Sequence, residues 1–357
     1  MYSGINSILL QYSLLRENTQ IVPFGTGLIN HTWKVVSGDS EYILQKINTQ
    51  IFSKPDLIAS NIEALGDYLA IHYPDYLFVP AIKTISGEGM VYDQDTDSYF
   101  RVFPFVKGSH AKTVLENANE AFEGAAQFGK FTKLLSGFDV HSLKITLPYF
   151  HDLGYRYQEF EQALQKNDVE RMIEAESVIA FMKEQAGIVL EYNVITNNPG
   201  LKLRVTHHDT KISNVLFDES DKAICVIDLD TIMPGYFISD VGDMMRTCLS
   251  TVSEEEKDFT KISIREDVYK AIVGGYYSQM KNELTLEEKP YFFYAGKFMI
   301  YMQALRFLTD HLNRDTYYGA KYPGHNLIRA SNQVTLLQRL LEKESLLADY
   351  QFSQEFV

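Results

Sequence analysis

The sequence predicts an α+β protein of two unequal lobes: a small β-rich N-terminal lobe over residues 1–106 and a larger, mostly helical C-terminal lobe over residues 107–357. Before residue 106, short β-branched and aromatic runs are separated by glycine turns. After Gly108, apolar residues recur at spacings of three and four between Glu, Gln and Lys, as in amphipathic helices. No low-complexity linker separates the two parts, so we expect two lobes of one unit rather than two free domains.

The N-terminal elements follow from local patterns. Apolar spacing predicts a helix over residues 3–17, and Pro55 opens a second helical run. A glycine turn at Ser37-Gly38-Asp39 is expected to join two strands into a hairpin. The expected strands are residues 21–29, 32–36, 41–47, 78–86 and 99–106.

The C-terminal part begins after a hinge expected at residues 103–108. Its pattern predicts helices first, then three short β-runs, and then a mainly helical segment from residue 239 to about residue 347. The first helices are expected at residues 112–136, 149–166 and 170–190, and the β-runs at residues 201–206, 215–217 and 223–227.

Composition excludes several classes of protein. Hydrophobic residues make up 45% and charged residues 22% of 357 residues, which is ordinary globular usage. Two cysteines do not form a disulfide framework, and we expect a reduced, cytoplasmic protein without a signal peptide or membrane span. The net charge of −14 disfavours nucleic acid and anionic membranes as partners, but not a nucleotide held by Mg²⁺ and a few local cations.

The most informative segment is H-H-D-T-K-I-S-N at residues 207–214, followed fourteen residues after Asn214 by Asp228 at the end of an apolar run. This pattern suits phosphoryl transfer. Asp209 can orient a hydroxyl nucleophile and take its proton. Asn214 and Asp228 offer oxygen ligands to one Mg²⁺ from two sides, and Lys211 could steady the γ-phosphate of ATP.

Other interpretations of this segment remain open. An isolated Asp or Asn after a strand is usually a turn or cap residue. A His-Asp pair could also bind the metal of a phosphohydrolase, which would require helical surroundings for His208 and Asp209. We assign His207 to packing and hydrogen bonding beneath the loop.

A kinase requires further parts upstream, and the sequence offers a candidate for each. Gly25 and Gly27 could form a flexible cover over the phosphates, with Asn30 in place of a third glycine. Lys46 on the third strand could pair with the phosphates and with Glu63 on the next helix. Alternatively, Lys46 is an ordinary surface lysine, and Glu63 belongs to a solvent-exposed helix face.

The adenine base is expected against the strand that links the lobes. Backbone groups of Phe103 and Phe105 are the candidates to face it.

In this order, the parts resemble the kinase-like phosphotransferases of small molecules, such as aminoglycoside phosphotransferases and choline kinases. About 100 residues separate the hinge from His207, no A-P-E segment follows Asp228, and Asp230 replaces the glycine of D-F-G, so a protein kinase is disfavoured. Longer strings resemble the N-acetylhexosamine 1-kinase group of that family. They are G-L-I-N-H-T (27–32), Y-I-L-Q-K-I-N (42–48), H-D-T-K-I-S-N (208–214), I-D-L-D-T-I-M-P-G (227–235) and R-F-L-T-D-H-L (306–312).

This resemblance implies a protein kinase-like bilobal fold that transfers the γ-phosphoryl group of ATP, with Mg²⁺, to the anomeric hydroxyl of N-acetylglucosamine or N-acetylgalactosamine. Sugar hydroxyls need planar polar groups and rings, and the candidate ligands are Arg306, Asp243, Arg246 and Tyr317. Asp310 and His325 are weaker candidates, and Asp240 is expected to hydrogen-bond the catalytic loop from below.

Two departures from the family pattern bear on the choice of sugar. Leu28 replaces a histidine and Ser213 replaces an asparagine. A kinase of the same fold for an amino alcohol, an aminoglycoside or another sugar remains an alternative, as does an inactive nucleotide-binding module. The sequence allows a monomer or a homodimer.

Overall fold

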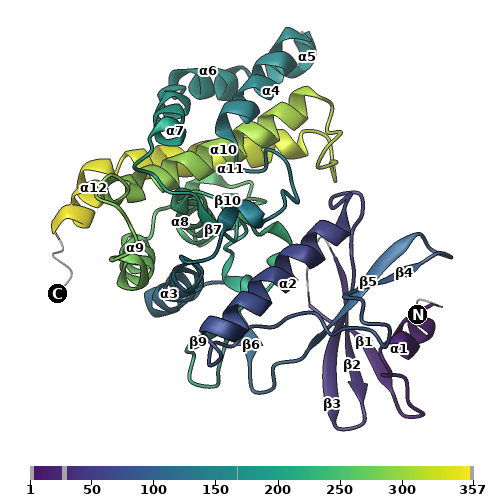
Figure 1. Cartoon of the computed structure of the whole chain (residues 1–357). Helices are drawn as coiled ribbons and strands as arrows, with labels where there is room; N and C mark the ends of the chain where they lie inside the picture. Colours follow the sequence, from purple (N-terminus) through teal and green to yellow (C-terminus); the bar gives the residue numbers. More distant parts are fainter. Residues whose placement is uncertain (1–3, 26–29, 167, 354–357) are drawn as a thin grey trace.

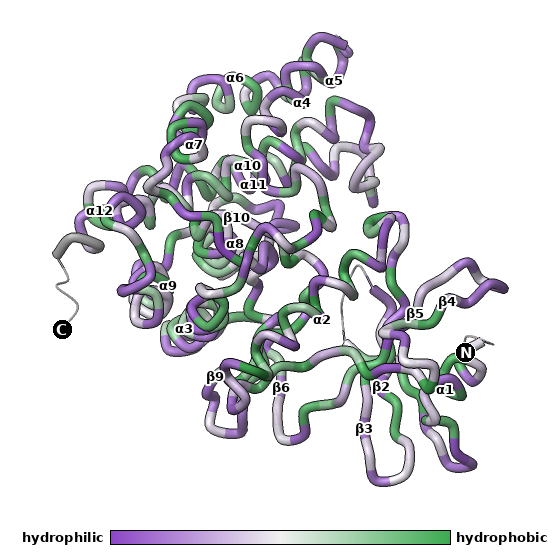
Figure 2. The backbone as a smooth tube through the Cα atoms, in the orientation of Figure 1, coloured by the Kyte–Doolittle hydropathy of each residue, from purple (hydrophilic) through white to green (hydrophobic). Residues whose placement is uncertain are grey.

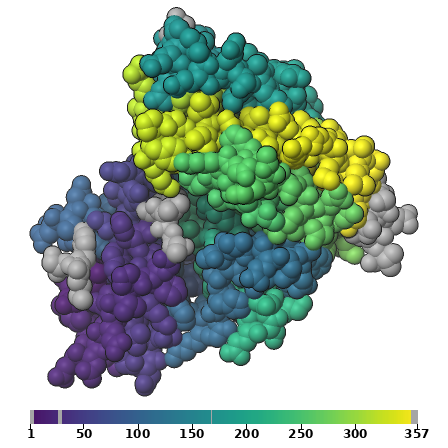
Figure 3. Space-filling model, turned by 180° about the vertical axis from the view of Figure 1, so that it is seen from behind, coloured from purple at the N-terminus to yellow at the C-terminus, as the bar shows by residue number. Residues whose placement is uncertain are grey.

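The computed structural model describes residues 4–25, 30–166 and 168–353 and has the two unequal lobes that the sequence predicts (Figure 1). A five-stranded antiparallel sheet and two helices form the N-terminal lobe. Helices and short strands that follow the sheet form the larger lobe. Seen from behind, a hollow separates the purple residues of the sheet from the green and yellow C-terminal helices (Figure 3). We call this hollow the interlobe groove.

The sheet has the strand order β1-β2-β3-β5-β4. Strands β2 and β3 form the predicted hairpin, and Gly38 in its turn has a φ of +62°, which glycine adopts without strain. The strand expected at residues 78–86 is wrong: Ile82 makes an isolated bridge with Val102, and β4 forms later in the chain. The strands are β1 (Gln20–Pro23), β2 (His31–Ser37), β3 (Ser40–Lys46), β4 (Val91–Asp93) and β5 (Ser98–Pro104).

The two faces of this sheet have different neighbours. Helix α1 (Ile5–Gln11), which is shorter than predicted, packs on one face against a cluster that includes Leu44, Phe100 and Val102. Residues directly opposite each other in an antiparallel pair lie on the same face, and successive residues alternate. Gln45 and its register partner Arg101 therefore lie on the other face, toward the groove.

Helix α2 (Pro55–His72) lies between the sheet and the helical lobe in Figure 1. Its buried residue Asn61 connects the lobes. The Asn61 side chain donates to the carbonyls of Lys144 and Ile232 at 2.8 and 3.0 Å, and it accepts from the Lys144 N–H at 2.8 Å. The amide thereby satisfies three backbone groups of the helical lobe, which fixes α2 against it.

The helical lobe is built around α10, whose residues are almost all buried. Figure 2 shows hydrophobic (green) residues along α2, α3 and α8. The helix expected at 170–190 is three helices, because Ala175 and the 185–186 segment interrupt it. The helices are α3 (Ala118–Leu134), α4 (Leu153–Gln165), α5 (Val169–Glu174), α6 (Glu176–Glu184), α7 (Gly187–Asn197), α8 (Phe237–Cys248), α9 (Glu266–Met280), α10 (Phe292–Leu312), α11 (His325–Leu341) and α12 (Glu344–Ser353). In the described part of the chain, no helix has the length and apolar character to cross a bilayer.

Short strands surround the segment that carries the phosphoryl-transfer pattern. Strand β7 (Arg204–Thr206) pairs with β10 (Met233–Gly235) and ends immediately before His207. Strands β8 (Val215–Phe217) and β9 (Ala223–Val226), both expected as β-runs, pair in an antiparallel hairpin, and β6 (His110–Ala111) pairs with β8. His208 and Asp209 thus lie in a loop between strands, contrary to the helical surroundings that a His-Asp phosphohydrolase requires.

Close packing of α3 on α9 gives a test of the helical lobe. A Cβ added at Gly275 would lie 2.3 Å from the Phe122 carbonyl oxygen, whereas one at the neighbouring Gly274 would meet only the Phe122 ring at 3.8 Å. We expect Gly275→Ala to lower the free energy of unfolding by about 1–3 kcal/mol or more. The matched control Gly274→Ala should be neutral or stabilising by up to about 1 kcal/mol. Urea denaturation of both variants measures this, and equal effects would contradict the packing.

Candidate active site

The loop at residues 207–214, which we call the catalytic loop, is held by two carboxylates of α8. Asp240 accepts hydrogen bonds from the backbone N–H groups of His207 and His208 at 3.1 and 2.8 Å. Burial raises the pKa of Asp240 to about 6, so it is mainly ionised at pH 7. Asp243 accepts from the N–H of Thr210 at 2.9 Å. The sequence prediction that Asp240 supports the loop from below agrees with this geometry.

Both histidines of the loop are engaged in structural hydrogen bonds. His207 Nε2 bonds to the Ile227 carbonyl at 3.0 Å, and its Nδ1 accepts from the Asp209 N–H at 3.3 Å. His208 Nδ1 bonds to the Thr206 carbonyl at 3.0 Å, and burial lowers the pKa of His208 to about 4. Rings used in this way do not form the ligand pair of a metal phosphohydrolase.

Asp209 lies between two polar neighbours from its own loop. Lys211 Nζ lies 2.9 Å from Asp209 Oδ1, and Asn214 Nδ2 donates to Asp209 Oδ2 at 3.2 Å and to its carbonyl at 2.8 Å. Burial would raise the pKa of Asp209, but the nearby Lys211 cation outweighs it and holds the pKa below its usual value. Asp209 is therefore ionised at neutral pH, as a base that orients a hydroxyl must be.

Asp228 follows β9 in a left-handed backbone conformation, with a φ of +62°. For a non-glycine residue this is strained, and such strain is common at functional sites. Its carboxylate is accessible to solvent. Desolvation by the surrounding protein, together with the negative charges of Asp230 and Asp209, nevertheless raises its pKa to about 7. Asp228 thus lies near two other carboxylates, Asp209, which pairs with Lys211, and Asp230, which pairs with Arg101.

The residues present fit a magnesium ion. The amide nitrogen of Asn214 donates to Asp209, so its Oδ1, the atom that can bind a metal, is not used in that contact. Asp228 supplies a hard oxygen ligand, and two other carboxylates lie near it. Within the described residues, no cluster of three His, Cys, Asp or Glu could hold a metal. Mg²⁺ does not require one, because it commonly takes one or two protein oxygens plus phosphates.

On the nucleotide side, the glycine-rich segment has a mixed outcome. Gly25 has a φ of +77°, and no atom lies within 4 Å of where a Cβ would be. Gly27 lies outside the described residues. Asn30 was expected to reach phosphate, but its Nδ2 donates to Asp230 Oδ2 at 2.9 Å and its Oδ1 accepts from the Asn48 N–H at 3.0 Å. Asn30 therefore links the sheet to the loop after Asp228, and its contact with phosphate stays a prediction.

The expected pair of Lys46 and Glu63 is corrected. Glu63 is exposed on α2 and pairs with Lys83 at 2.6 Å. Lys46 is opposite Phe100 in the strand register, and Phe100 belongs to the cluster under α1. Because opposed residues share a face, Lys46 lies on the α1 face of the sheet and not on the groove face.

The two residues expected to face adenine, Phe103 and Phe105, have backbone groups that face strand β3. The Phe105 N–H donates to the Glu41 carbonyl at 3.0 Å, so it is not available to adenine. Phe103 is two residues earlier in the same ladder and also has its backbone groups toward β3. The Pro104 carbonyl, by the alternation of the ladder, points away from β3.

On the other side of Asp209, two predicted sugar ligands form a buried charge network. Asp243 Oδ1 accepts from Arg246 Nε at 3.0 Å, while its Oδ2 holds Thr210. Arg246 Nη1 also pairs with Glu254 at 3.0 Å, and Glu254 pairs in turn with Arg329. Asp243 therefore supports the catalytic loop and Arg246, and its role as a sugar ligand stays a prediction.

Arg306 lies among three aromatic rings. Its guanidinium is 5.3, 5.9 and 5.5 Å from the ring centres of Phe150, Tyr317 and Tyr318. Its Nη2 contacts the Tyr317 hydroxyl at 3.5 Å. Asp310 does not pair with it, because Asp310 accepts from the backbone N–H groups of Tyr317 and Tyr318 at 2.7 and 2.9 Å. Asp310 therefore shapes the loop that presents Tyr317.

His325, the other weak candidate, is buried and pairs with Glu255 at 2.6 Å.

Phe150 and His151 were missed by the sequence analysis. The centre of the His151 ring lies 5.1 Å from that of His208. The Phe150 ring lies near both the His208 ring and the Arg306 guanidinium. The pKa of His151 is lowered, mainly by burial and then by the charges of His208, Arg306, Arg246 and Arg156. These two residues belong to no recognisable motif, so no local signal could have identified them.

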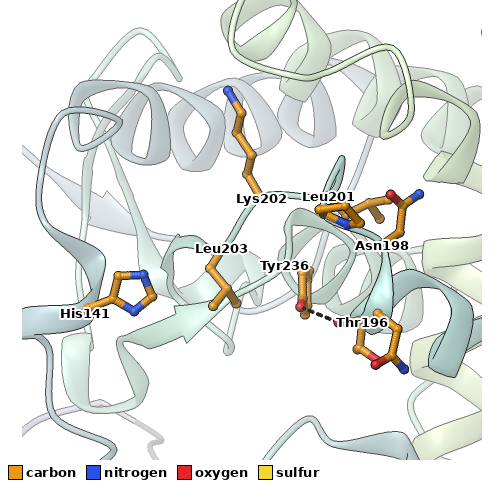
Figure 4. A pocket seen from close by; sticks show the side chains of 9 residues that line it. His141, Thr196, Asn198, Leu201, Lys202, Leu203 and Tyr236 are labelled. Carbon is orange, nitrogen blue, oxygen red and sulfur yellow. Dashed lines mark hydrogen bonds between the residues drawn. The ribbon is translucent and has the colours of Figure 1, made fainter.

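A different pocket of about 450 Å³ lies away from the catalytic loop (Figure 4). Residues between α7 and β7, with His141 and Tyr236, line it, and the Tyr236 hydroxyl donates to the Thr196 carbonyl at 3.2 Å. It contains no carboxylate and no residue of the catalytic loop. Its titratable lining residues are His141, Lys202 and Tyr236, and none of the phosphoryl-transfer candidates lies in it.

The raised pKa of Asp228 predicts a gain in stability when its charge is removed. The folded-state pKa of about 7 lies above the usual value of 3.8 for an aspartate, so this group destabilises the metal-free fold increasingly as pH rises through that window. We expect Asp228→Asn to have a higher melting temperature than wild type at pH 8 and nearly the same one at pH 4. Thermal unfolding without divalent cations measures this, and a lower value at pH 8 would contradict the electrostatic account.

Solved structures with the same fold cover nearly the whole chain. A spectinomycin phosphotransferase in complex with ADP and spectinomycin has a TM-score of 0.58 at 12% identity, covering 95% of this chain and 96% of that chain. A microcompartment-associated aminopropanol kinase has a TM-score of 0.57 at 18% identity, with 97% and 99% covered. A choline kinase from Streptococcus pneumoniae has a TM-score of 0.52 at 12% identity, with 89% and 93% covered.

The sequence itself gives the family. The profile of the phosphotransferase enzyme family (APH) matches residues 20–260, which include the sheet, α2, the catalytic loop and Asp228. The chain therefore belongs to the phosphotransferase enzyme family and is a small-molecule phosphotransferase.

Proposed function

We propose that this enzyme transfers the γ-phosphoryl group of ATP to the anomeric hydroxyl of an N-acetylhexosamine, N-acetylglucosamine or N-acetylgalactosamine, and releases the sugar 1-phosphate. The observation that carries the choice of acceptor is Arg306. Among the described residues, no carboxylate lies within ion-pair distance of its guanidinium, which is surrounded by aromatic rings and Gln303. A neutral, oxygen-rich acceptor suits this cation.

The catalytic residues have separate roles. Asp209 orients the acceptor hydroxyl and takes its proton as the bond to phosphorus forms. The anomeric hydroxyl is more acidic than an ordinary alcohol, so an ionised carboxylate is a sufficient base. Asn214 and Asp228 would hold Mg²⁺, which when bound neutralises charge on the phosphates. Lys211 pairs with Asp209, so its ammonium group can stabilise the negative charge of the phosphoryl group during transfer.

The electrostatics of the acceptor side argue against a cationic acceptor. The structural relatives named above include kinases of spectinomycin, aminopropanol and choline, all of which carry amines or a quaternary ammonium. In this chain, burial is the main cause that lowers the pKa of His151, and the charges of His208, Arg306, Arg246 and Arg156 lower it further. Arg306, which has no carboxylate partner among the described residues, would repel an ammonium group. Arg306 can instead donate to the acetamido carbonyl or to ring hydroxyls, and Phe150 or Tyr317 can stack on the sugar.

A panel of acceptors tests this proposal. Purified protein with Mg·ATP would be given N-acetylhexosamines, unacetylated hexoses, aminoglycosides and amino alcohols, with coupled detection of ADP. NMR of the product identifies both the acceptor and the position of the new phosphate. We expect turnover on an N-acetylhexosamine with phosphate on the anomeric oxygen. Turnover confined to amines would replace this proposal with an amine kinase.

The role of Asp209 gives a separate prediction. Asp209→Asn should lower turnover by about 10²–10⁴-fold because the base is lost, while the affinity for Mg·ATP stays nearly unchanged. Asp228→Ala should instead weaken Mg·ATP binding. Steady-state kinetics and nucleotide titration separate the two effects. Near-normal turnover of Asp209→Asn would show that another group takes the proton.

A further inference from the structure

The groove face of the sheet carries a cation that the sequence analysis did not select. Arg101 on β5 is opposite Gln45 on β3, and its Nε and Nη2 donate to Gln45 Oε1 at 3.2 and 2.9 Å. Its Nη1 lies 2.6 Å from Asp230 Oδ1 in the other lobe. Both charged side chains are almost fully buried, with 4% and 3% exposed. Lys46, by contrast, lies on the α1 face.

This ion pair lies where the parts of a nucleotide site meet. Asp230 is two residues beyond Asp228, the expected metal ligand, on the same short turn. The second oxygen of Asp230 accepts from Asn30, which ends the glycine-rich segment. The Arg101 guanidinium therefore shares its partner Asp230 with Asn30 and lies next to the turn after Asp228, which is expected to hold the metal.

Other cations near the groove have different partners. Lys34 shares the groove face with Gln45, but it pairs with Glu41 at 2.8 Å and lies over the Phe105 ring at 4.1 Å, near the hinge. Lys211 pairs with the catalytic Asp209. Neither lies at the junction between Asn30 and Asp228.

We propose that Arg101 is the N-lobe cation that binds the phosphates of the nucleotide, and that Asp230 positions it from the helical lobe. This rests on the proposed function. The expected Lys46–Glu63 pair is thereby replaced by a cation on β5 and a carboxylate on the turn after Asp228. Arginine suits the task because its guanidinium presents five N–H donors in a planar fork that matches phosphate. The contacts with Gln45 and Asp230 engage three of them, through Nε, Nη2 and Nη1.

The buried pair also explains how the cation stays in place before nucleotide binds. A guanidinium removed from water must be paired, and Asp230 and Gln45 satisfy this need. Because Asp230 shares a short turn with Asp228, binding of phosphate to Arg101 would act on the same segment that binds the metal. Arg101 would thus join the two lobes around the triphosphate.

The test compares ligands that differ only in phosphates. Dissociation constants for adenosine, Mg·ADP and Mg·ATP would be measured by competition against a fluorescent ATP analogue. The proteins are wild type, Arg101→Met, Arg101→Lys and, for the competing hypothesis, Lys46→Met. Thermal unfolding checks that each variant folds. If Arg101→Met does not fold, the binding comparison is made with Arg101→Lys.

We expect Arg101→Met to weaken Mg·ADP and Mg·ATP binding by about 10–100-fold, the range of a charge-assisted hydrogen-bond pair, with less than about threefold change for adenosine. Arg101→Lys should recover part of the loss because the charge remains. Equal weakening of adenosine and Mg·ADP would overturn the proposal by showing a purely structural role. A phosphate-dependent loss in Lys46→Met but not in Arg101→Met would overturn it in favour of Lys46. Wild type that binds none of these ligands would overturn the proposed function as well.

Discussion

The active site depends on two buried carboxylates that hold the backbone of one loop. Asp240 accepts the N–H groups of two successive residues, and Asp243 accepts that of Thr210, so the chain on both sides of Asp209 is fixed to α8. Buried N–H groups need partners, and a loop without regular structure must find them in side chains. Helix α8 is itself packed against α10 in the core of the helical lobe. The position of the base is thus set by the most buried part of the molecule.

A second constraint is the negative charge gathered at the lobe junction. Desolvation, together with the negative charges of Asp230 and Asp209, raises the pKa of Asp228 to about 7. Such a cluster weakens the metal-free fold but prepares it for a divalent cation. The lobes meet at the same place, through Asn30 and Arg101 with Asp230 and through Asn61 with Ile232. Binding of a cation and closure of the lobes would therefore act on the same few residues.

The sequence predicted the parts of the site that are local in the chain. Asp209, Lys211 and Asn214 lie within one short loop, so their spacing already determines that they meet. It also predicted the bilobal fold and the β2–β3 hairpin, because alternation and the Gly38 turn are local signals.

The errors on the nucleotide side come from a common cause. In a strand, a shift of one residue moves a side chain to the opposite face. Lys46 lies on the α1 face while its neighbour Gln45 faces the groove, and the Phe105 N–H donates to the Glu41 carbonyl of strand β3. Arg101 was overlooked because its partner, Asp230, is far away in the sequence. Strand face and long-range partners require the three-dimensional structure.

The account is tested most directly by a crystal structure of the protein with ADP and Mn²⁺, in which anomalous scattering locates the metal. We predict a metal within about 2.3 Å of Asn214 Oδ1 and an Asp228 carboxylate oxygen, bridging to the nucleotide phosphates. The Asp209 carboxylate should face the acceptor side of those phosphates. A metal bound without Asn214 and Asp228, or a nucleotide far from Asp209, would contradict the central claim that these three residues form one phosphoryl-transfer site.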